Sequence, residues 1–224
     1  MDSSQWTNIN STVQIIPTTR QFYGQFYYKL VYNLVGAALL RSVSSLDQLA
    51  RRAFSSRHIQ NDQIAFDKLV TFFNAVNQSQ GLRWRCEGNS LSVFAETEQA
   101  LIDLATTTLK DYGSSLVSVT RVANQQDREI LESGNVIMRK PTDYRYKVSI
   151  RDGYRNTRDR KLLANYLTTI RSEIRISDHL LAGMTLGNKY LHSCYFYVND
   201  PRIVDMIALV APTIIKKVQE VVIR

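Results

Sequence analysis

The chain has 224 residues, 44% of them hydrophobic and 21% charged, a composition typical of a folded globular protein and not of a disordered one. Its formal net charge of +8 makes polyanions, acidic proteins and anionic lipid surfaces plausible partners. No apolar stretch reaches the roughly 18 residues that a membrane-spanning helix needs, so the sequence predicts no membrane partner. The polar residues 1–20 also lack the cationic start and apolar centre of a secretory signal.

The first 123 residues contain a polar arm and then one set of regular elements. Residues 1–20 are predicted to form a polar N-terminal arm in which Trp6, Ile15 and Ile16 are able to dock onto another surface. Alternation of apolar and polar residues predicts a strand within 21–34. The elements predicted next are helices at about 44–54 and 62–78, a hairpin of strands at 82–86 and 91–96, a helix from Thr97 to about 111, and a closing strand at 116–122.

A second set of elements follows a polar connector at residues 124–141, in which Val136–Met138 is able to add an edge strand. The Asp200-Pro201 pair is a strong helix start, because it places a carboxylate cap before a proline at the first helical position. The elements predicted for residues 142–224 are a strand at 144–150, a helix from Thr157, strands at 174–181 and 190–198, a helix after Asp200, and a closing strand at 218–223.

The two sets have the same order, and Tyr28-Lys29 in the first matches Tyr146-Lys147 in the second, about 118 residues later. Strand, helix, strand, strand, helix, strand is the order of a ferredoxin-like unit. The sequence therefore predicts an α+β fold made of two tandem ferredoxin-like (βαββαβ) units with antiparallel sheets, at residues 21–123 and 142–224.

In such a sheet the helices cover one face and leave the other face open. Alternation in the second unit directs Arg145, Lys147 and Arg151 outward from the first strand, and Tyr195 and Tyr197 outward from the third strand beside it. Aromatic side chains stack bases and cations hold phosphates. This pattern predicts binding of single-stranded nucleic acid, with RNA favoured over DNA.

The first unit carries a weaker version of the same pattern. Tyr27, Lys29, Arg83 and Arg85 share its outward phase and are further candidates for nucleic-acid contact. The alternative for both units is that the outward aromatic side chains pack the units against each other, while the cations are only solvated.

Basic residues are concentrated at the start of the second unit. Nine basic residues and three acidic residues lie between Arg139 and Lys161. Because helix N-termini bind anions, the helix start at Thr157 is a second candidate for phosphate contact. The basic residues around it are Arg151, Arg155, Arg158, Arg160 and Lys161. A solvated basic loop is the alternative interpretation.

Signals for catalysis, metals and cofactors are weak. The histidines have no zinc-type spacing, and His58 and His179 are the two weak candidates for acid–base catalysis of metal-independent RNA cleavage. Surface histidines are the alternative. Cys86 and Cys194 lie in apolar or aromatic runs without metal-ligand neighbours, which predicts free thiols, no metal site and a reducing, cytoplasmic setting. No cofactor is predicted.

Residues 191–198 contain the aromatic side chains of the RNA-recognition-motif octapeptide but lack its basic-glycine start, and residues 211–218 lack the glycine-rich loop of Cas6-type proteins. In element order the chain resembles tandem ferredoxin-like RNA binders, which include paired RNA-recognition-motif proteins and the RAMP group with its Cas6-type nucleases. This resemblance implies RNA as the ligand and, for the Cas6 type, endonuclease activity.

The main alternative function is that of a structural or adaptor protein in an assembly, with a protein partner or a second copy of the chain on the basic and aromatic surface. The absence of a family signature is typical of phage and viral proteins, for which the setting is the host cytoplasm. The arm and the edge strand at 136–138 favour this alternative, because both offer surfaces for pairing.

Overall fold

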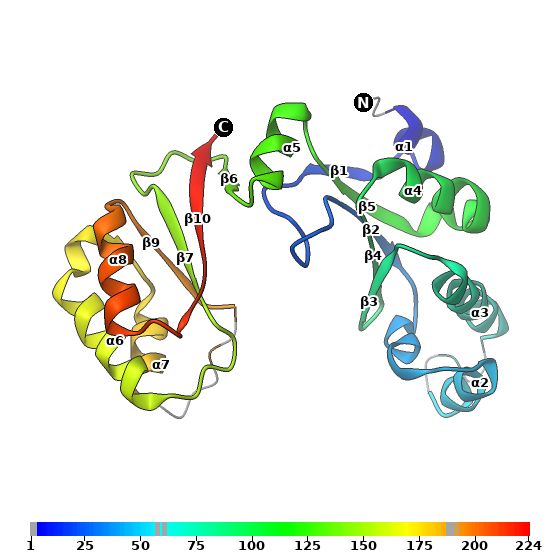
Figure 1. Ribbon diagram of the computed structural model, residues 1–224. Helices are drawn as coiled ribbons and strands as arrows, with labels where there is room; N and C mark the ends of the chain where they lie inside the picture. Colours follow the sequence, from blue (N-terminus) through cyan, green and yellow to red (C-terminus); the bar gives the residue numbers. More distant parts are fainter. Residues whose placement is uncertain (1–3, 57–58, 60–61, 187–190, 192) are drawn as a thin grey trace. The chain divides into compact units, whose positions relative to one another are not determined.

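The computed structural model describes residues 4–56, 59, 62–186, 191 and 193–224 (Figure 1). The chain divides into two compact units, Met1–Arg128 (unit 1) and Glu129–Arg224 (unit 2), and the boundary lies within the connector predicted from the sequence. Each unit has its own sheet. No helix in the described residues is long and apolar enough to cross a membrane.

Unit 1 begins with a short helix and an edge strand, and the elements of the predicted set follow. Its regular elements are α1 (Ser4–Ile9), β1 (Gln14–Pro17), β2 (Tyr28–Asn33), a 3-10 segment (Ala37–Ser42), α2 (Leu46–Phe54), α3 (Gln63–Gln78), β3 (Arg83–Glu87), β4 (Ser90–Ala95), α4 (Glu98–Asp103), a π-helical turn (Leu104–Thr108), a second 3-10 segment (Lys110–Ser115), β5 (Leu116–Arg121) and α5 (Gln125–Glu132), which continues into unit 2.

The strand order in unit 1 is β1-β5-β2-β4-β3. β2, β3, β4 and β5 are joined by antiparallel pairing, and β1 adds to the edge parallel to β5. Alternate residues of β2, namely Tyr28, Leu30 and Tyr32, are at most 1% exposed and face the core. The Tyr32 ring lies 5.2 Å from that of Phe72 on α3, so the helices cover this face of the sheet.

The helix starts predicted in unit 1 are confirmed, and their side-chain caps explain why. Ser45 caps α2 by accepting a hydrogen bond from the Gln48 amide, and Asp62 caps α3 by accepting one from the Ala65 amide. Thr97 caps α4 in the same way. Each cap supplies an acceptor for an amide that the first helical turn leaves without a partner.

The N-terminal segment is part of unit 1 rather than an extended arm. Trp6 on α1 is 0% exposed, and its indole Nε1 donates a 2.8 Å hydrogen bond to Glu98. Glu98 also lies 3.3 Å from the buried guanidinium of Arg121. Ile15 and Ile16 pair with β5 as part of β1. The surface onto which this segment docks is therefore part of unit 1.

The thiol of Cys86 on β3 provides a test of how this strand packs in unit 1. Burial raises the pKa of its thiol to about 11, whereas an ordinary cysteine has a pKa of about 8.5. At pH 8 we expect Cys86, in a Cys194→Ala background, to react with a thiol reagent at least about tenfold more slowly in the folded protein than in urea.

The direction of the pH dependence follows from the raised pKa of Cys86. The protonated thiol stabilises the fold below about pH 8.5, and this contribution is lost as the pH rises towards 11. The reaction rate of the folded protein should therefore still be rising between pH 9 and pH 11. Equal rates for the folded and unfolded chains at pH 8 would contradict the partial burial of this thiol.

Unit 2 repeats the arrangement, and each of its strands except the last is shorter than its counterpart in unit 1. After the end of α5, its elements are β6 (Val136–Met138), β7 (Tyr146–Ile150), α6 (Thr157–Thr169), a 3-10 turn (Arg171–Glu173), β8 (Ile174–Arg175), α7 (Asp178–Leu186), β9 (Tyr195–Val198), α8 (Pro201–Val210) and β10 (Ile215–Ile223). The helix starts at Thr157 and at Asp200-Pro201 are confirmed, with Asn156 and Asp200 as the caps.

The strand order in unit 2 is β6-β10-β7-β9-β8. The four strands of the repeated set are, in chain order, β2, β3, β4 and β5 in unit 1 and β7, β8, β9 and β10 in unit 2. When they are numbered one to four, both sheets have the order four, one, three, two. In each sheet an additional strand, β1 or β6, lies beside the fourth. Figure 1 shows α6, α7 and α8 on one side of this sheet. They pack there on residues such as Val148, Phe196 and Val198, which are fully buried. The opposite side chains of the strands are directed away from these helices.

Two parts of the fold prediction are corrected by the structure. The sheets are five-stranded and mixed, because β1 joins β5 in parallel and β6 joins β10 in parallel. The edge strand expected at Val136–Met138 is confirmed as β6.

The second correction concerns residues 174–181, which the sequence predicted to be one strand. Only Ile174–Arg175 is a strand, and α7 begins at Asp178. The Ser177 hydroxyl accepts a hydrogen bond from the Leu180 amide at 3.2 Å, which favours a helix start. Leu180 and Met184, four residues apart, are then both buried in the core.

Candidate nucleic-acid interface

Seven polar or aromatic side chains share the face of the unit 2 sheet that is opposite the helices, and we call this surface the tyrosine face. Arg175, Tyr197, Lys147 and Gln219 form one row across β8, β9, β7 and β10. Tyr195, Ser149 and Lys217 form the next row. Side chains directly opposite each other on neighbouring strands lie within contact distance. The first row thus reads cation, aromatic, cation, amide.

The two tyrosines of this face lie side by side on β9. Their ring centroids are 5.5 Å apart in an edge-to-face arrangement, and the Lys147 ammonium lies 4.2 Å from the centre of the Tyr195 ring. Tyr195 is 46% exposed, and Tyr197 is half-buried. Partial burial, together with the neighbouring Tyr195, raises the pKa of Tyr197, so the phenol is neutral at physiological pH. This surface offers neutral aromatic rings flanked by cations.

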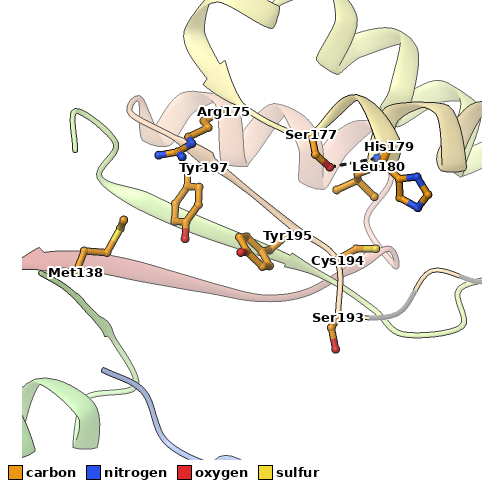
Figure 2. A pocket seen from close by; sticks show the side chains of 9 residues that line it. All are labelled: Met138, Arg175, Ser177, His179, Leu180, Ser193, Cys194, Tyr195 and Tyr197. Carbon is orange, nitrogen blue, oxygen red and sulfur yellow. Dashed lines mark hydrogen bonds between the residues drawn. The ribbon is translucent and has the colours of Figure 1, made fainter. Parts of the chain in front are cut away.

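A pocket of about 380 Å³ opens beside the tyrosines (Figure 2). Figure 2 shows Arg175 next to Tyr197, with Tyr195 further along the same strand. The wall on the other side comes from the start of α7 and from the residues before β9. The lining side chains are Met138, Arg175, Ser177, His179, Leu180, Ser193, Cys194, Tyr195 and Tyr197.

Part of the tyrosine face was predicted from the sequence, and part of it was not. Lys147, Tyr195 and Tyr197 lie together as expected. Arg175 and Lys217 were missed, although both are exposed and share the face. The signal for Arg175 was its position between the buried Ile174 and Ile176. Lys217 could not be assigned from alternation alone, because the register shifts between Ile215 and Lys217.

Arg145 does not join the tyrosine face. It precedes β7, and its Nε lies 3.7 Å from a carboxylate oxygen of Glu220. Its guanidinium is 5.8 Å from the ring of Tyr146, which packs against the core. The side chain is nevertheless 63% exposed, so it remains available to a ligand that extends beyond the end of β7.

The basic loop and the start of α6 present exposed cations at Arg151, Arg155, Arg158 and Lys161. Asn156 occupies the helix start itself, because its side-chain oxygen accepts hydrogen bonds from the Arg158 and Asp159 amides. These cations therefore offer long-range attraction of an anion rather than a built phosphate pocket.

Arg160 differs from the other basic residues of α6. It is 2% exposed, and its guanidinium donates a hydrogen bond to the Gly183 carbonyl on α7. Burial lowers its pKa. This side chain joins α6 to α7 inside the fold, so Arg160 is not part of the candidate interface.

Unit 1 has a row with the same pattern. Arg83, Phe94, Lys29 and Thr120 are paired across β3, β4, β2 and β5. Lys29 and Lys147 are therefore in equivalent positions, each being the second residue of its strand and each lying opposite an aromatic residue of the third strand of the repeated set. The resemblance between the halves extends to the face opposite the helices.

This row is covered in unit 1 by the chain itself. Phe94 is only 4% exposed, because the Phe22 and Tyr23 rings lie 5.3 and 5.0 Å from it. The Arg83 guanidinium stacks 3.7 Å from the centre of the Tyr23 ring. Partial burial, and then the nearby Arg85, lowers the pKa of Lys29.

The remaining candidates of unit 1 are also engaged with its own residues. The Tyr27 hydroxyl accepts a hydrogen bond from Gln21, and Arg128 lies 5.5 Å from the Tyr27 ring. Arg85 forms an ion pair with Glu87. The face of unit 1 is therefore occupied by intramolecular contacts to a greater extent than that of unit 2.

His179 is exposed on α7 and lines the pocket beside Tyr195. His58 lies outside the described residues. Among the residues that the structure describes, no group of three or more His, Cys, Asp or Glu side chains is arranged to hold a metal ion.

Searches against protein-family models, curated proteins and solved structures found no match to this chain.

Proposed function

We propose that the protein binds single-stranded nucleic acid, with RNA as the first choice, through the tyrosine face of unit 2. The observation that carries this proposal is the row Arg175–Tyr197–Lys147, together with the Lys147 ammonium 4.2 Å from the exposed Tyr195 ring. The seven side chains of the face include three cations and no carboxylate. Such a surface combines stacking area with positive charge.

The two kinds of side chain have different tasks in this proposal. Unpaired bases stack on Tyr195 and Tyr197, because every base has an apolar ring face, and this makes binding tolerant of sequence. Lys147, Arg175 and Lys217 attract the phosphates and release counterions, which makes binding sensitive to salt. A duplex hides its base faces, so the proposal favours single strands.

We further propose that both units are ferredoxin-like, each extended by one parallel edge strand. The strand order four, one, three, two and the antiparallel pairing of these strands support this interpretation. Such a sheet leaves one face without helices, which is the face on which RNA-binding proteins of this architecture hold their ligand. The resemblance noted from element order therefore agrees with the proposed location of the site.

The rival is an adaptor whose tyrosine face meets a protein partner or a second copy of the chain. Two features that favoured this rival are accounted for within the units, because Trp6 is buried in unit 1 and Val136–Met138 pairs with β10. Light scattering separates the two functions. A monomer that binds RNA supports our proposal, whereas a closed oligomer without RNA affinity supports the adaptor.

Lys216 and Lys217 provide a matched pair of variants to test the proposal. Lys217 lies on the tyrosine face, whereas the adjacent Lys216 forms a 2.7 Å ion pair with Asp152. We expect Lys217→Ala to weaken RNA binding and to reduce the slope of log affinity against log salt by about 0.7, because one phosphate contact is lost. Lys216→Ala should leave the slope unchanged.

The measurement is fluorescence anisotropy of a labelled single-stranded RNA at four or five salt concentrations. Equal slopes for the wild type and Lys217→Ala, or an equal decrease in both variants, would remove the tyrosine face from the proposal.

A further inference from the structure

The ring of Tyr23 packs on the face of the unit 1 sheet that is opposite the helices, where a bound aromatic ligand could also lie. Its ring is held edge-on against Phe94 at 5.0 Å and lies 3.7 Å from the Arg83 guanidinium. The backbone of Tyr23 has φ 54°, a left-handed conformation that costs free energy in a residue other than glycine. Gly24, with φ 79°, completes the turn between Phe22 and Phe26. Contacts of the ring offset this strain.

The row that receives Tyr23 is repeated in unit 2. Arg175 and Tyr197 occupy the positions of Arg83 and Phe94, since both pairs are cross-strand neighbours in the same row as the equivalent lysines. In unit 2 these two side chains line the pocket of about 380 Å³. Tyr144, which precedes β7, packs tilted against Tyr197 with 6.3 Å between the ring centroids, and it is not among the side chains that line the pocket. The place that the Tyr23 ring fills beside Arg83 and Phe94 in unit 1 thus corresponds to a pocket beside Arg175 and Tyr197 in unit 2.

We propose that this pocket binds one unpaired nucleobase of the ligand, held between the Arg175 guanidinium and the Tyr197 and Tyr195 rings as Tyr23 is held in unit 1. This inference rests on the proposed function and adds a defined subsite to it. Guanidinium groups stack on planar rings, and aromatic rings pack edge-on or offset against them.

The chemistry of the pocket favours a nucleobase over an aromatic peptide side chain. The pocket lies on a face with three cations and no carboxylate among its seven side chains, which suits the phosphates next to a base. The hydroxyls of Ser177 and Ser193 line the pocket and are able to hydrogen-bond the polar edge of a base. The volume is near the lower end of the usual range for ligand pockets, roughly 300–1,000 Å³, and suits a single nucleotide.

The test uses the full chain and a single-stranded uridine hexamer with one 2-aminopurine at its centre, whose fluorescence is quenched on stacking. A second hexamer has an abasic nucleotide at the same place. We expect quenching on binding and about tenfold weaker binding of the abasic hexamer, since one stack is lost.

Arg175→Lys keeps the charge of the site but loses the planar guanidinium. It should therefore retain the salt dependence of the wild type while losing most of the quenching. Arg83→Lys is the matched control, because it makes the same change in the row of unit 1 that Tyr23 already fills, and it should quench like the wild type.

The outcomes separate this inference from the proposed function. Equal affinity for the abasic and base-containing hexamers, or full quenching in Arg175→Lys, overturns the nucleobase site and leaves RNA binding intact. Failure of the wild type to bind any hexamer at low salt overturns the proposed function as well.

Discussion

Replacing Tyr195 and Tyr197 together by alanine is expected to weaken binding of single-stranded RNA by about 2–6 kcal/mol, because each lost stack costs about 1–3 kcal/mol. This corresponds to a loss in affinity of roughly 30-fold to 2 × 10⁴-fold. The expectation depends on the exposure of the rings, since Tyr195 is 46% exposed and the two rings touch edge to face. Anisotropy titrations of the same labelled RNA measure the change.

Two controls distinguish lost stacking from lost folding. The double replacement by phenylalanine keeps the rings and should retain most of the affinity. Tyr27→Ala removes a tyrosine that is already engaged with Gln21 and Arg128 in unit 1, so it should leave RNA binding unchanged. If the double alanine variant keeps its circular dichroism spectrum and binds RNA like the wild type, base stacking on this face is excluded.

The second large effect is expected for stability. Trp6→Ala should reduce the free energy of unfolding of unit 1 by about 3–5 kcal/mol, the usual cost of truncating a buried aromatic residue to alanine. Trp6 is 0% exposed, and its loss also removes the donor to Glu98. Because folded domains are stable by only about 5–15 kcal/mol, this is a large fraction of the total.

Trp6→Phe is the matched variant, since it keeps one aromatic ring while it loses the indole donor and part of the buried volume, and we expect a smaller cost of about 1–3 kcal/mol. Urea unfolding followed by circular dichroism gives both values. A change below about 1 kcal/mol for Trp6→Ala would show that α1 is not packed against unit 1 as described.

Much of the fold follows from local chemistry that can be read in the sequence. The caps Ser45, Asp62, Thr97 and Asp200 each accept a backbone hydrogen bond at the predicted helix start. Residues 174–181 could not be assigned in this way, because Ile-Arg-Ile alternates as a strand does and the helix depends on a single serine acceptor. The parallel edge strands depend on partners more than 80 residues away, as with Ile15 and Val119.

The residues of the candidate site could be predicted where alternation along a strand shows which side chains face away from the core. Lys147, Tyr195 and Tyr197 come from strands with clear alternation. Arg175 comes from a two-residue strand, and Lys217 follows an irregularity in the register, so pairing had to be known before either could be placed. The covering of Phe94 by Tyr23 depends on a turn with positive φ angles that leaves no periodic signal in the sequence.

The most direct test of the central proposal is an anisotropy titration of the wild-type protein against a mixed-sequence single-stranded RNA and its duplex, at 50 and 200 mM salt. If only the three cations of the tyrosine face contact phosphates, affinity for the single strand should fall by about 20-fold over this range, and by more if the basic loop contributes. The duplex should bind more weakly, because its base faces are hidden. Absence of binding to the single strand at 50 mM salt, or tighter binding of the duplex, would contradict the proposal.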